Sequence, residues 1–346
     1  KTEAKNLDLG LYLLVETKVP EMVTSTTDPF LVSVPMTTVN GTNADNGGTT
    51  WIYDITLYPK NLTGIPTLEK TLRENKNDTG KHNGSTSNIT DGYAHTGTAS
   101  AGDVLDYQII STLPTITSES TYLSCYTFVD TLSKGLTYTK GDVVLEFFTD
   151  AACTDKIASW KETDGKFSVA YNTSSAGEGV MTIEMTAEGL AEINTSKTVY
   201  ADASMVNTGY SDCTVRITYT AKMDSDNSVV FGDIGNDNKV VLTWKRTSSE
   251  YYDTLIDDAH IFTFGVDLTK LFSDLDSESA TEMDMFKHVK FRIRNTTDGY
   301  WVTATRDEAT GIYYVTGHVT EEADGTVFYP VTVNGEFGKV VIKGVE

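Results

Sequence analysis

The chain has 346 residues, which is enough for two or three domains. It carries 27 Lys and Arg against 49 Asp and Glu, and the net charge of −22 argues against nucleic-acid binding, which needs a basic face. No apolar run reaches the roughly 18 residues of a membrane helix, so we expect no membrane segment in the mature form. Only seven prolines, with abundant Thr, Val, Tyr and Gly, predict an all-β chain of short strands, as in β-sandwiches.

The first segment, residues 1–64, has the pattern of a few strands and a polar loop. Leu11–Pro20 predicts a strand that places Glu16 in line with core residues, where its carboxylate must be neutral or paired. The alternative is a glutamate at the strand end that faces solvent. Pro29–Met36 is a second predicted strand, and Thr37–Thr50 is a predicted loop. Three strands cannot easily bury both faces, so we expect the C-terminal part of a domain in a mature or truncated fragment.

The stretch Trp51–Asn61, with the sequence WIYDITLYPKN, predicts a strand followed by an exposed lysine. Aromatic and β-branched residues alternate as far as Tyr58. Pro59 ends the strand because proline cannot donate a backbone hydrogen bond. Lys60 is therefore expected on an extended segment, and composition alone would make it an ordinary surface lysine.

Two motifs in this segment resemble those of Gram-positive sortase-assembled pilins. Trp51, Tyr58, Pro59 and Lys60 match the pilin motif in order. The resemblance implies that the Lys60 amine attacks a sortase acyl-enzyme carrying the C-terminal threonine of the next subunit. YLLVETKVP is similar to the E-box of Cna-B-type immunoglobulin-like domains in these pilins, where the glutamate promotes a Lys–Asn isopeptide bond in some domains. We assign the matching Glu16 a structural role and leave a catalytic role open.

A middle domain is predicted over residues 65–248, with three polar side chains on core faces. Lys70 lies between two leucines of the first strand, Asp130 follows two aromatic residues of a middle strand, and Asn238 continues the apolar face of the last strand. For Lys70 the alternative is a twisted edge strand with the amine directed to solvent. The other predicted elements are a loop at Asn75–Ser100, a helix at Ala187–Ile193, and strands at Val104–Thr112, Val143–Phe148, Phe167–Ala170, Met181–Met185, Thr214–Ala221 and Val240–Trp244.

Together the three polar residues suit one reaction. Burial lowers the pKa of a lysine amine, and the neutral amine is a nucleophile. A carboxylic acid kept protonated by burial can polarise an asparagine amide and transfer protons. The amine of Lys70 would attack the amide carbon of Asn238, ammonia would leave, and a covalent bond would join the first and last strands. Asn236 has the same strand parity and is the alternative partner.

The middle domain also resembles the Cna-A-type domain of backbone pilins. The matching stretches are EKTL with Lys70, FVDTLSKGLTY with Asp130, VRITYTA, and GNDNKVVLTW at the end. The resemblance implies a Lys70–Asn238 isopeptide bond that Asp130 promotes. Such a bond is a single autocatalytic maturation step, so we do not expect an enzyme acting on an external substrate.

The last segment, residues 249–346, is predicted to follow a polar linker at Lys245–Asp258. Ala259–Lys270 predicts a strand with Lys270 on its apolar face, and it is similar to the opening of a Cna-B-type C-terminal pilin domain. In that domain type the matching lysine forms an isopeptide bond. No partner for Lys270 is visible, so a bond would use residues outside the sequence, and we expect an incomplete domain. Later strands are predicted at Val289–Arg294, Tyr300–Thr305, Ile312–Thr316 and Lys339–Ile342.

The leading hypothesis is a structural protein, the shaft subunit of a covalent Gram-positive pilus built from tandem immunoglobulin-like β-sandwich domains. The alternative is a wall-anchored adhesin or an accessory tip or basal pilin of the same domain type. Expected partners are copies of the chain, a pilus-specific sortase, accessory pilins and host surface ligands, and the expected location is an extracellular pilus anchored to the cell wall. No HExxH, P-loop or dinucleotide motif occurs, so we expect no cofactor or metal. Cys125, Cys153 and Cys213 allow at most one disulfide.

Overall fold

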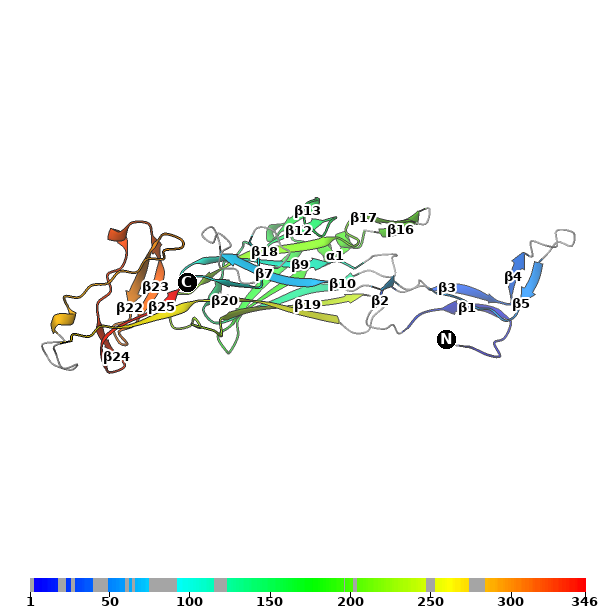
Figure 1. Ribbon diagram of the computed structural model, residues 1–346. Helices are drawn as coiled ribbons and strands as arrows, with labels where there is room; N and C mark the ends of the chain where they lie inside the picture. The colour runs from blue at the N-terminus through cyan, green and yellow to red at the C-terminus, as the bar shows by residue number, and fades with distance from the viewer. Residues whose placement is uncertain are drawn as a thin grey trace.

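A computed structural model gives the fold and describes residues 3–17, 23–25, 29–39, 49–59, 62–63, 66–74, 92–114, 123–195, 197–201, 204–246, 253–273 and 284–346. The described chain is almost entirely β and is drawn out along one axis, with an N-terminal, a middle and a C-terminal unit in sequence order (Figure 1). The all-β prediction is therefore confirmed. Among these residues no helix is long and apolar enough to cross a bilayer.

In the N-terminal unit, the described residues form three separate strand pairs. They are β1 (Gly10–Leu14) with β3 (Phe30–Val34), β4 (Met36–Val39) with β5 (Thr49–Ile52), and β2 (Val23–Ser25) with β6 (Leu62–Thr63). Val32 is buried, whereas Leu11, Leu13 and Leu31 are each more than half exposed.

The predicted strand over Trp51–Tyr58 is wrong beyond Ile52. The pairing of β4 with β5 ends at the pair of Met36 and Ile52. Among the described residues, Tyr53–Pro59 belong to no strand. Alternation of aromatic and β-branched residues is necessary for a paired strand, but a neighbour must also supply the hydrogen bonds. Tyr58 is 83% exposed, which agrees with the predicted exposed end of the motif.

The middle unit is a sandwich of two sheets. Sheet I contains, in spatial order, β14 (Phe167–Thr173), β15 (Gly179–Met185), β10 (Leu123–Leu132), β19 (Asn236–Arg246), β20 (Asp253–Phe262) and β8 (Thr96–Thr98). Sheet II contains β13 (Lys156–Lys161), β12 (Val144–Phe148), β18 (Thr214–Met223), β9 (Val104–Thr112) and β7 (Leu68–Glu74), and β11 (Leu136–Tyr138) pairs with β18. The pairs are antiparallel except β8, which runs parallel to β20.

One large core fills the space between the two sheets. Alternate residues of the long strands point inward, and the core is rich in aromatic side chains such as Tyr107, Phe128 and Trp160. The predicted helix α1 (Ala187–Ile193) is present, and the Thr186 hydroxyl accepts a hydrogen bond from the Gly189 backbone at its start. Outside the two sheets, β16 (Lys197–Ala201) and β17 (Ser204–Thr208) form a hairpin, and Glu162–Asp164 is a 3₁₀ turn.

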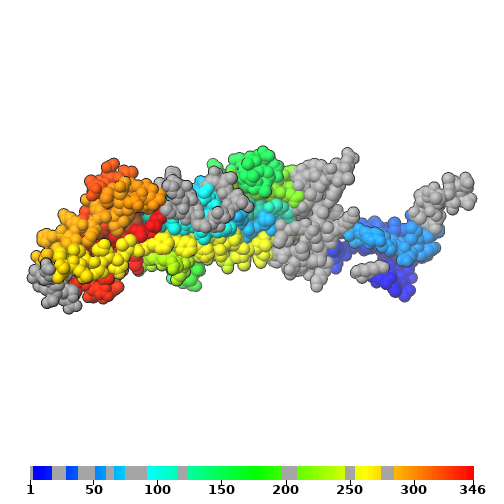
Figure 2. All heavy atoms as spheres, viewed as in Figure 1, coloured from blue at the N-terminus to red at the C-terminus, as the bar shows by residue number. Residues whose placement is uncertain are grey.

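The predicted linker at Lys245–Asp258 is wrong over the part that the structure describes. β19 continues to Arg246, and β20 begins at Asp253 and pairs with β19 as far as Ile261. Leu255, Ala259 and Ile261 face the core of the middle unit, but the adjacent acidic residues obscure this alternation in the sequence. The yellow chain of β20 and β21 runs along the middle unit and into the C-terminal unit (Figure 2). Similarly, β8 lies inside the stretch predicted as a loop.

The C-terminal unit contains a sheet in the order β21 (Phe264–Thr269), β25 (Glu336–Val345), β23 (Tyr313–Val319) and β22 (Trp301–Arg306), with β24 (Val331–Val333) paired to β25. Glu322–Asp324 is a 3₁₀ turn. A small core of its own includes Val315, Phe328 and Ile342. The predicted strand Val289–Arg294 is wrong, because only isolated bridges form there.

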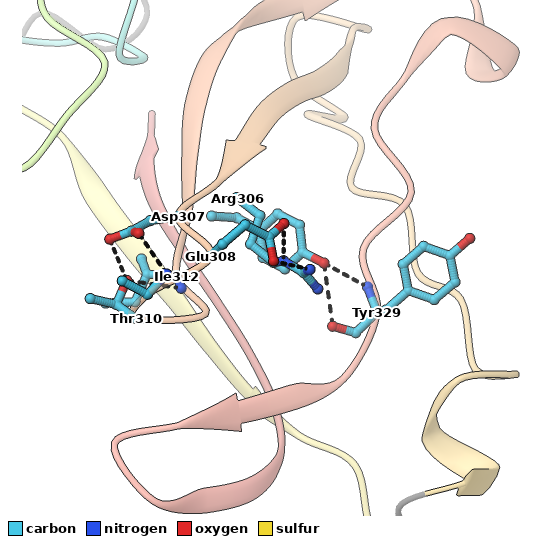
Figure 3. Close-up of polar contacts among 8 residues, drawn as sticks. Arg306, Asp307, Glu308, Thr310, Ile312 and Tyr329 are labelled. Atoms are coloured by element: carbon cyan, nitrogen blue, oxygen red, sulfur yellow. Dashed lines mark hydrogen bonds and ion pairs between the residues drawn. The ribbon is translucent and has the colours of Figure 1, made fainter.

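A network of hydrogen bonds shapes the turn from β22 to β23 (Figure 3). The Asp307 carboxylate accepts from the Ala309 backbone at 2.9 Å and from the Thr310 hydroxyl at 2.8 Å. These bonds lower the pKa of Asp307. Arg306 and Glu308 pair through two hydrogen bonds beside the turn.

Candidate functional site

Four polar side chains meet in the core of the middle unit. Lys70 on β7 and Tyr219 on β18 enter from sheet II, whereas Asp130 on β10 and Asn238 on β19 enter from sheet I. Lys70, Asp130 and Asn238 are fully buried, and Tyr219 is 2% exposed. The strand alternation explains this placement, since each residue shares a face with buried apolar neighbours. The three inward positions expected from the sequence are thus occupied as predicted.

The Tyr219 hydroxyl connects the other three groups. The Lys70 amine donates to Asp130 Oδ2 at 2.5 Å and to the Tyr219 hydroxyl at 2.9 Å. Tyr219 donates to Asp130 Oδ2 at 2.7 Å and accepts from Asn238 Nδ2 at 2.7 Å. The amine and the amide are therefore each one hydrogen bond from the same oxygen atom.

The environment of the amine is apolar and aromatic. Burial lowers the pKa of Lys70, and the neighbouring Asp130 carboxylate opposes this shift only in part. Tyr107 stacks on Tyr219 with ring centroids 5.3 Å apart, and the Lys70 amine lies 5.2 and 5.3 Å from the two ring centroids. The two rings exclude water while still offering their faces to a cation.

Two oxygen atoms of this cluster have no hydrogen-bond partner among the described residues. They are Asp130 Oδ1 and Asn238 Oδ1. Buried polar atoms are rarely left unpaired in native proteins, and such atoms often mark a reactive site. The cluster therefore holds an amine of lowered pKa, an amide and a carboxyl group in one fully buried place, which is the set of groups that transamidation needs.

Asn236, the alternative partner, is also fully buried but is engaged elsewhere. Its side chain accepts from the Val230 backbone N–H at 2.9 Å and donates to the Val230 carbonyl at 2.9 Å. It also donates to the Ile261 carbonyl at 3.4 Å. These bonds hold the loop before β19 in place, and the structure brings Asn238, not Asn236, to the lysine.

The other predicted site residues lie apart from this cluster. Glu16 follows the end of β1 by two residues and is half-buried, so the structure does not extend the strand to it as predicted. Lys270 follows β21 and is half-buried; its amine donates to the Leu271 carbonyl at 3.0 Å and lies 4.8 Å from the Phe272 ring. An isopeptide role for Lys270 stays a prediction. Lys60 lies outside the described residues, directly after the exposed Pro59.

Sequence reasoning assigned no role to Tyr219 or Tyr107. The alternation in TVRITYTA does place Tyr219 inward, and a buried tyrosine hydroxyl needs a partner. That requirement is the signal that could have linked Tyr219 to the lysine on another strand. Tyr107 lies on β9, and nothing in its local sequence distinguishes it from an ordinary core aromatic residue.

One group of side chains in the described chain has the chemistry of metal ligands. Asp237, Asp258 and His260 lie on the outer face of β19 and β20, and their ligand atoms are within 4.8 Å of one another. Lys239 lies opposite Asp258 in the same strand pair and supplies a competing positive charge. The three cysteines are free, so none of them forms a disulfide.

A model of a known protein family matches the first segment of the chain. Residues 1–62 match the Gram-positive pilin subunit D1, N-terminal domain. The first 62 residues are therefore similar to this pilin domain. This finding confirms the resemblance indicated by the motif at Trp51–Asn61, which lies at the end of the matched range.

One relative and two solved structures are also similar to parts of this chain or to its fold. The chain is 28% identical over 136 residues to the fimbrial subunit type 2 of Actinomyces naeslundii, an alignment that covers 39% of this chain and 21% of that protein. The full-length major pilin SpaD of Corynebacterium diphtheriae is similar in structure, with a TM-score of 0.52, 18% identity, and coverage of 98% of this chain and 61% of that chain. The T6 backbone pilin of serotype M6 Streptococcus pyogenes gives a TM-score of 0.51, 14% identity, and coverage of 98% and 63%.

The two structural likenesses concern the fold alone because the identities are low. They show that the fold of these two proteins is similar to that of this chain over nearly its whole length. The chain spans about three fifths of each solved pilin and matches about a fifth of the fimbrial subunit.

Proposed function

We propose that the chain is a structural shaft subunit of a covalent pilus on the surface of a Gram-positive bacterium. The observation that carries this proposal is the match of residues 1–62 to the pilin N-terminal domain, because that range contains the Tyr-Pro-Lys motif. The elongated row of β-units supports it, since a shaft needs subunits that extend along the fibre (Figure 1).

In this proposal Lys60 receives the C-terminal threonine of the next subunit from a pilus-specific sortase. The contact between copies is then head to tail, and such a heterologous contact generates a filament rather than a closed ring. Tyr58 and Pro59 are exposed, so an enzyme can approach the chain immediately before the lysine. Accessory pilins join the same polymer, and the pilus is extracellular and anchored to the cell wall.

Replacing Lys60 by alanine tests the shaft function. We expect Lys60→Ala to remove the ladder of high-mass, detergent-resistant polymers seen by immunoblot of cell-wall extracts, because the acceptor amine is gone. Lys5→Ala is the matched control, since Lys5 is an exposed lysine of the same segment, and it should leave the ladder unchanged. A full-length ladder in Lys60→Ala would contradict the proposal and favour an adhesin or accessory pilin.

We further propose that Lys70 and Asn238 form an internal isopeptide bond with Asp130 as the proton carrier. The Lys70 ammonium gives a proton to Asp130, and the neutral amine attacks Asn238 Cγ. Asp130 donates a proton to the developing oxyanion at Asn238 Oδ1, then accepts a proton from the attacking nitrogen. Asp130 passes that proton to the amide nitrogen, which leaves as ammonia, and as the carbonyl reforms the Oδ1 hydroxyl gives its proton back to Asp130. Tyr219 holds both reacting groups, which supplies the proximity that such a step needs.

The bond would tie sheet I to sheet II. β7 is an edge strand of sheet II, and β19 lies in the interior of sheet I with β20 beyond it. The expected link between first and last strands is therefore refined, because β20 and not β19 is the last long strand of the middle unit. A covalent link across the sandwich carries load without relying on the marginal free energy of folding.

A further inference from the structure

The two sheets of the middle unit meet along one edge, which we call the seam, where β7 of sheet II lies beside β20 of sheet I (Figure 1). β7 is paired with β9 on one side only, so the N–H groups on its other side need acceptors from outside sheet II. At Leu72 the acceptor is a backbone carbonyl, since Leu72 and Ala94 exchange two hydrogen bonds of 2.9 Å. At Lys70 the acceptor is a side chain, because the Lys70 N–H donates to Asp257 Oδ2 at 2.6 Å.

This side-chain contact involves the residue that carries the reacting amine. Asp257 lies on β20, opposite Val240 of β19. Two residues further along β20, Ala259 lies opposite Asn238. The hydrogen bond therefore joins the backbone of the proposed nucleophile to the strand next to the proposed electrophile. A displacement of about 1 Å between reacting groups can slow a reaction about 100-fold, so the distance that this bond fixes matters for the reaction.

The Asp257 carboxylate lies among groups from both sides of the seam. His95, just before β8 of sheet I, has its Nδ1 atom 4.0 Å from the same Oδ2 atom of Asp257 that accepts from Lys70. The other ring nitrogen of His95 lies 3.8 Å from Glu69, the residue before Lys70 on β7. The imidazole thus lies between a carboxylate of β20 and a carboxylate of β7, which limits how far the Asp257 side chain can turn away from the Lys70 backbone.

The negative charge of Asp257 does not favour the reaction by itself. Burial lowers the pKa of Lys70, whereas Asp130 and, to a smaller extent, Asp257 and Asp237 raise it. Only the neutral amine is a nucleophile, so the charge of Asp257 reduces the reactive fraction of Lys70. Any contribution of Asp257 to the reaction must therefore come from where it holds the Lys70 backbone.

We propose that Asp257 is a positioning residue for the isopeptide bond between Lys70 and Asn238, an inference that rests on the proposed function. Its hydrogen bond fixes the backbone at Lys70 and thereby the path of the amine toward the amide. The contact between Leu72 and Ala94 does not involve Asp257, so β7 stays attached to the seam when Asp257 is replaced. Loss of the Asp257 carboxylate should then leave the fold intact and let the backbone move at Lys70.

The test is the rate of bond formation in full chains that have just been made. Translation in a cell-free system is stopped at one time, samples are denatured at intervals, and intact-mass spectrometry gives the fraction that has become lighter by about 17 Da, one ammonia. We expect Asp257→Ala to slow this loss about tenfold or more, because Lys70 is no longer held. Asp257→Asn keeps an oxygen acceptor without the charge and should react within about threefold of the wild-type rate.

Asp258→Ala is the matched control, because Asp258 is the next residue of β20 and its side chain is 51% exposed. It should react at the wild-type rate. An unchanged rate in Asp257→Ala would overturn the proposal, and so would equal slowing by Asp257→Ala and Asp257→Asn, since the charge and not the hydrogen bond would then matter. A wild type that never loses ammonia would overturn the isopeptide bond itself, together with this inference, and the wild-type sample alone reveals that result.

Hydrogen exchange at single amides separates positioning from folding, and it is measured in the Asn238→Ala background, where no bond can form. Adding Asp257→Ala should speed exchange of the Lys70 N–H about tenfold or more, while the Leu72 N–H, which donates to Ala94, stays protected. Adding Asp257→Asn should leave both amides protected. Loss of protection at Leu72 as well would make Asp257 a residue of the fold, and full protection at Lys70 would mean that the carboxylate does not hold it. Either result overturns the proposal.

Discussion

Lys70 is a fully buried lysine, and the cost of burying an ammonium group explains its surroundings. Asp130 supplies the opposite charge, Tyr219 supplies a hydroxyl, and two tyrosine rings supply their faces. A buried pair of this kind is strongly destabilised when one partner is removed, by about 3–5 kcal/mol, because an unpaired charge remains. Conversion of the amine to an amide removes the charge altogether, so the proposed bond also relieves this cost.

The first prediction concerns the mass of the mature protein. Relative to the mass calculated from its sequence, the wild type should be lighter by about 17 Da, one ammonia, for the bond at this site. Lys70→Met and Asn238→Ala should lack this loss, and Asp130→Ala should retain it only in a small fraction because the proton carrier is gone. Intact-mass spectrometry measures all four proteins, and peptide mapping locates the cross-link.

Two controls accompany the mass measurement. Lys222→Ala changes an exposed lysine on β18 and should keep the 17 Da loss of the wild type, about one ammonia. Asn236→Ala should also keep the loss, although it should lower the free energy of unfolding by about 1–3 kcal/mol because the Val230 backbone loses its partners. If Asn236→Ala abolishes the loss, Asn236 and not Asn238 is the reacting residue.

A second residue-scale prediction concerns pH. Asn238→Ala keeps a free Lys70, whose pKa burial lowers from 10.5. Between the lowered pKa and 10.5 the unfolded chain binds more protons than the folded chain, so the free energy of unfolding should rise with pH across this window. Urea unfolding at a series of alkaline pH values measures the rise. The double variant Lys70→Met, Asn238→Ala lacks the amine, and an equal rise in it would show that other groups are responsible.

Strand alternation could predict that the three polar residues face the core, whereas the prediction that they meet rested on their joint chemistry and on the resemblance to a Cna-A-type domain. Strand alternation alone put Lys70, Asp130 and Asn238 on core faces, because a period of two is visible over a few residues. The strands that carry these three residues belong to two different sheets, and the sheets come together only when the sandwich folds. Tyr219 contacts all three residues only when the two sheets are packed together. Its local sequence therefore did not distinguish it from other core tyrosines.

At the scale of elements, the bounds of a strand or helix were predicted correctly where the apolar periodicity of the sequence begins and ends with the element itself. β9 and α1 have the predicted bounds, and both have clear apolar periodicity with defined ends. The first part of β20, up to Asp258, was missed because acidic residues interrupt its apolar alternation. One of them, Asp257, accepts a hydrogen bond from the Lys70 backbone at 2.6 Å where β20 meets β7. The end of the β5 strand was misplaced because a partner strand, and not the local pattern, determines where pairing stops.

The turn between β10 and β11 provides a prediction at this scale. Gly135 has φ of +84°, and a Cβ there would lie 2.7 Å from the Val229 Cα. Gly135→Ala should therefore lose stability through both the left-handed backbone, about 1–2 kcal/mol, and the steric overlap, about 1–3 kcal/mol. Gly141→Ala is the matched control, because Gly141 has the same φ but no described atom within 4 Å of its Cβ position. Chemical denaturation compares the two, and equal losses would contradict the steric part of the argument.

At the scale of the whole molecule, the middle and C-terminal units are joined by more than the chain that links them. The Ala101 backbone donates to the Gly344 carbonyl at 2.9 Å, and the Thr263 hydroxyl donates to the Val345 carbonyl at 3.0 Å. The Tyr300 hydroxyl lies 3.1 Å from the Ser100 hydroxyl. Such contacts, between positions up to 243 residues apart in the case of Ala101 and Gly344, could not be predicted from local sequence patterns.

A side chain placed where the backbones of the two units approach each other closely should disrupt the contact between the units. Gly102 has φ of +94°, and a Cβ there would lie 2.5 Å from the Thr316 carbonyl oxygen of the C-terminal unit. We expect Gly102→Ala to separate the two units, because a backbone atom cannot move aside as a flexible side chain can. Calorimetry should resolve two melting transitions in place of a coupled one, and small-angle scattering should show a broader distribution of interatomic distances. Gly232→Ala, at a similar φ of +90° but with no described atom within 4 Å, should keep the wild-type profile in both measurements. A compact, singly melting Gly102→Ala would mean that the hydrogen bonds around Ala101 and Tyr300 hold the units together without this close approach.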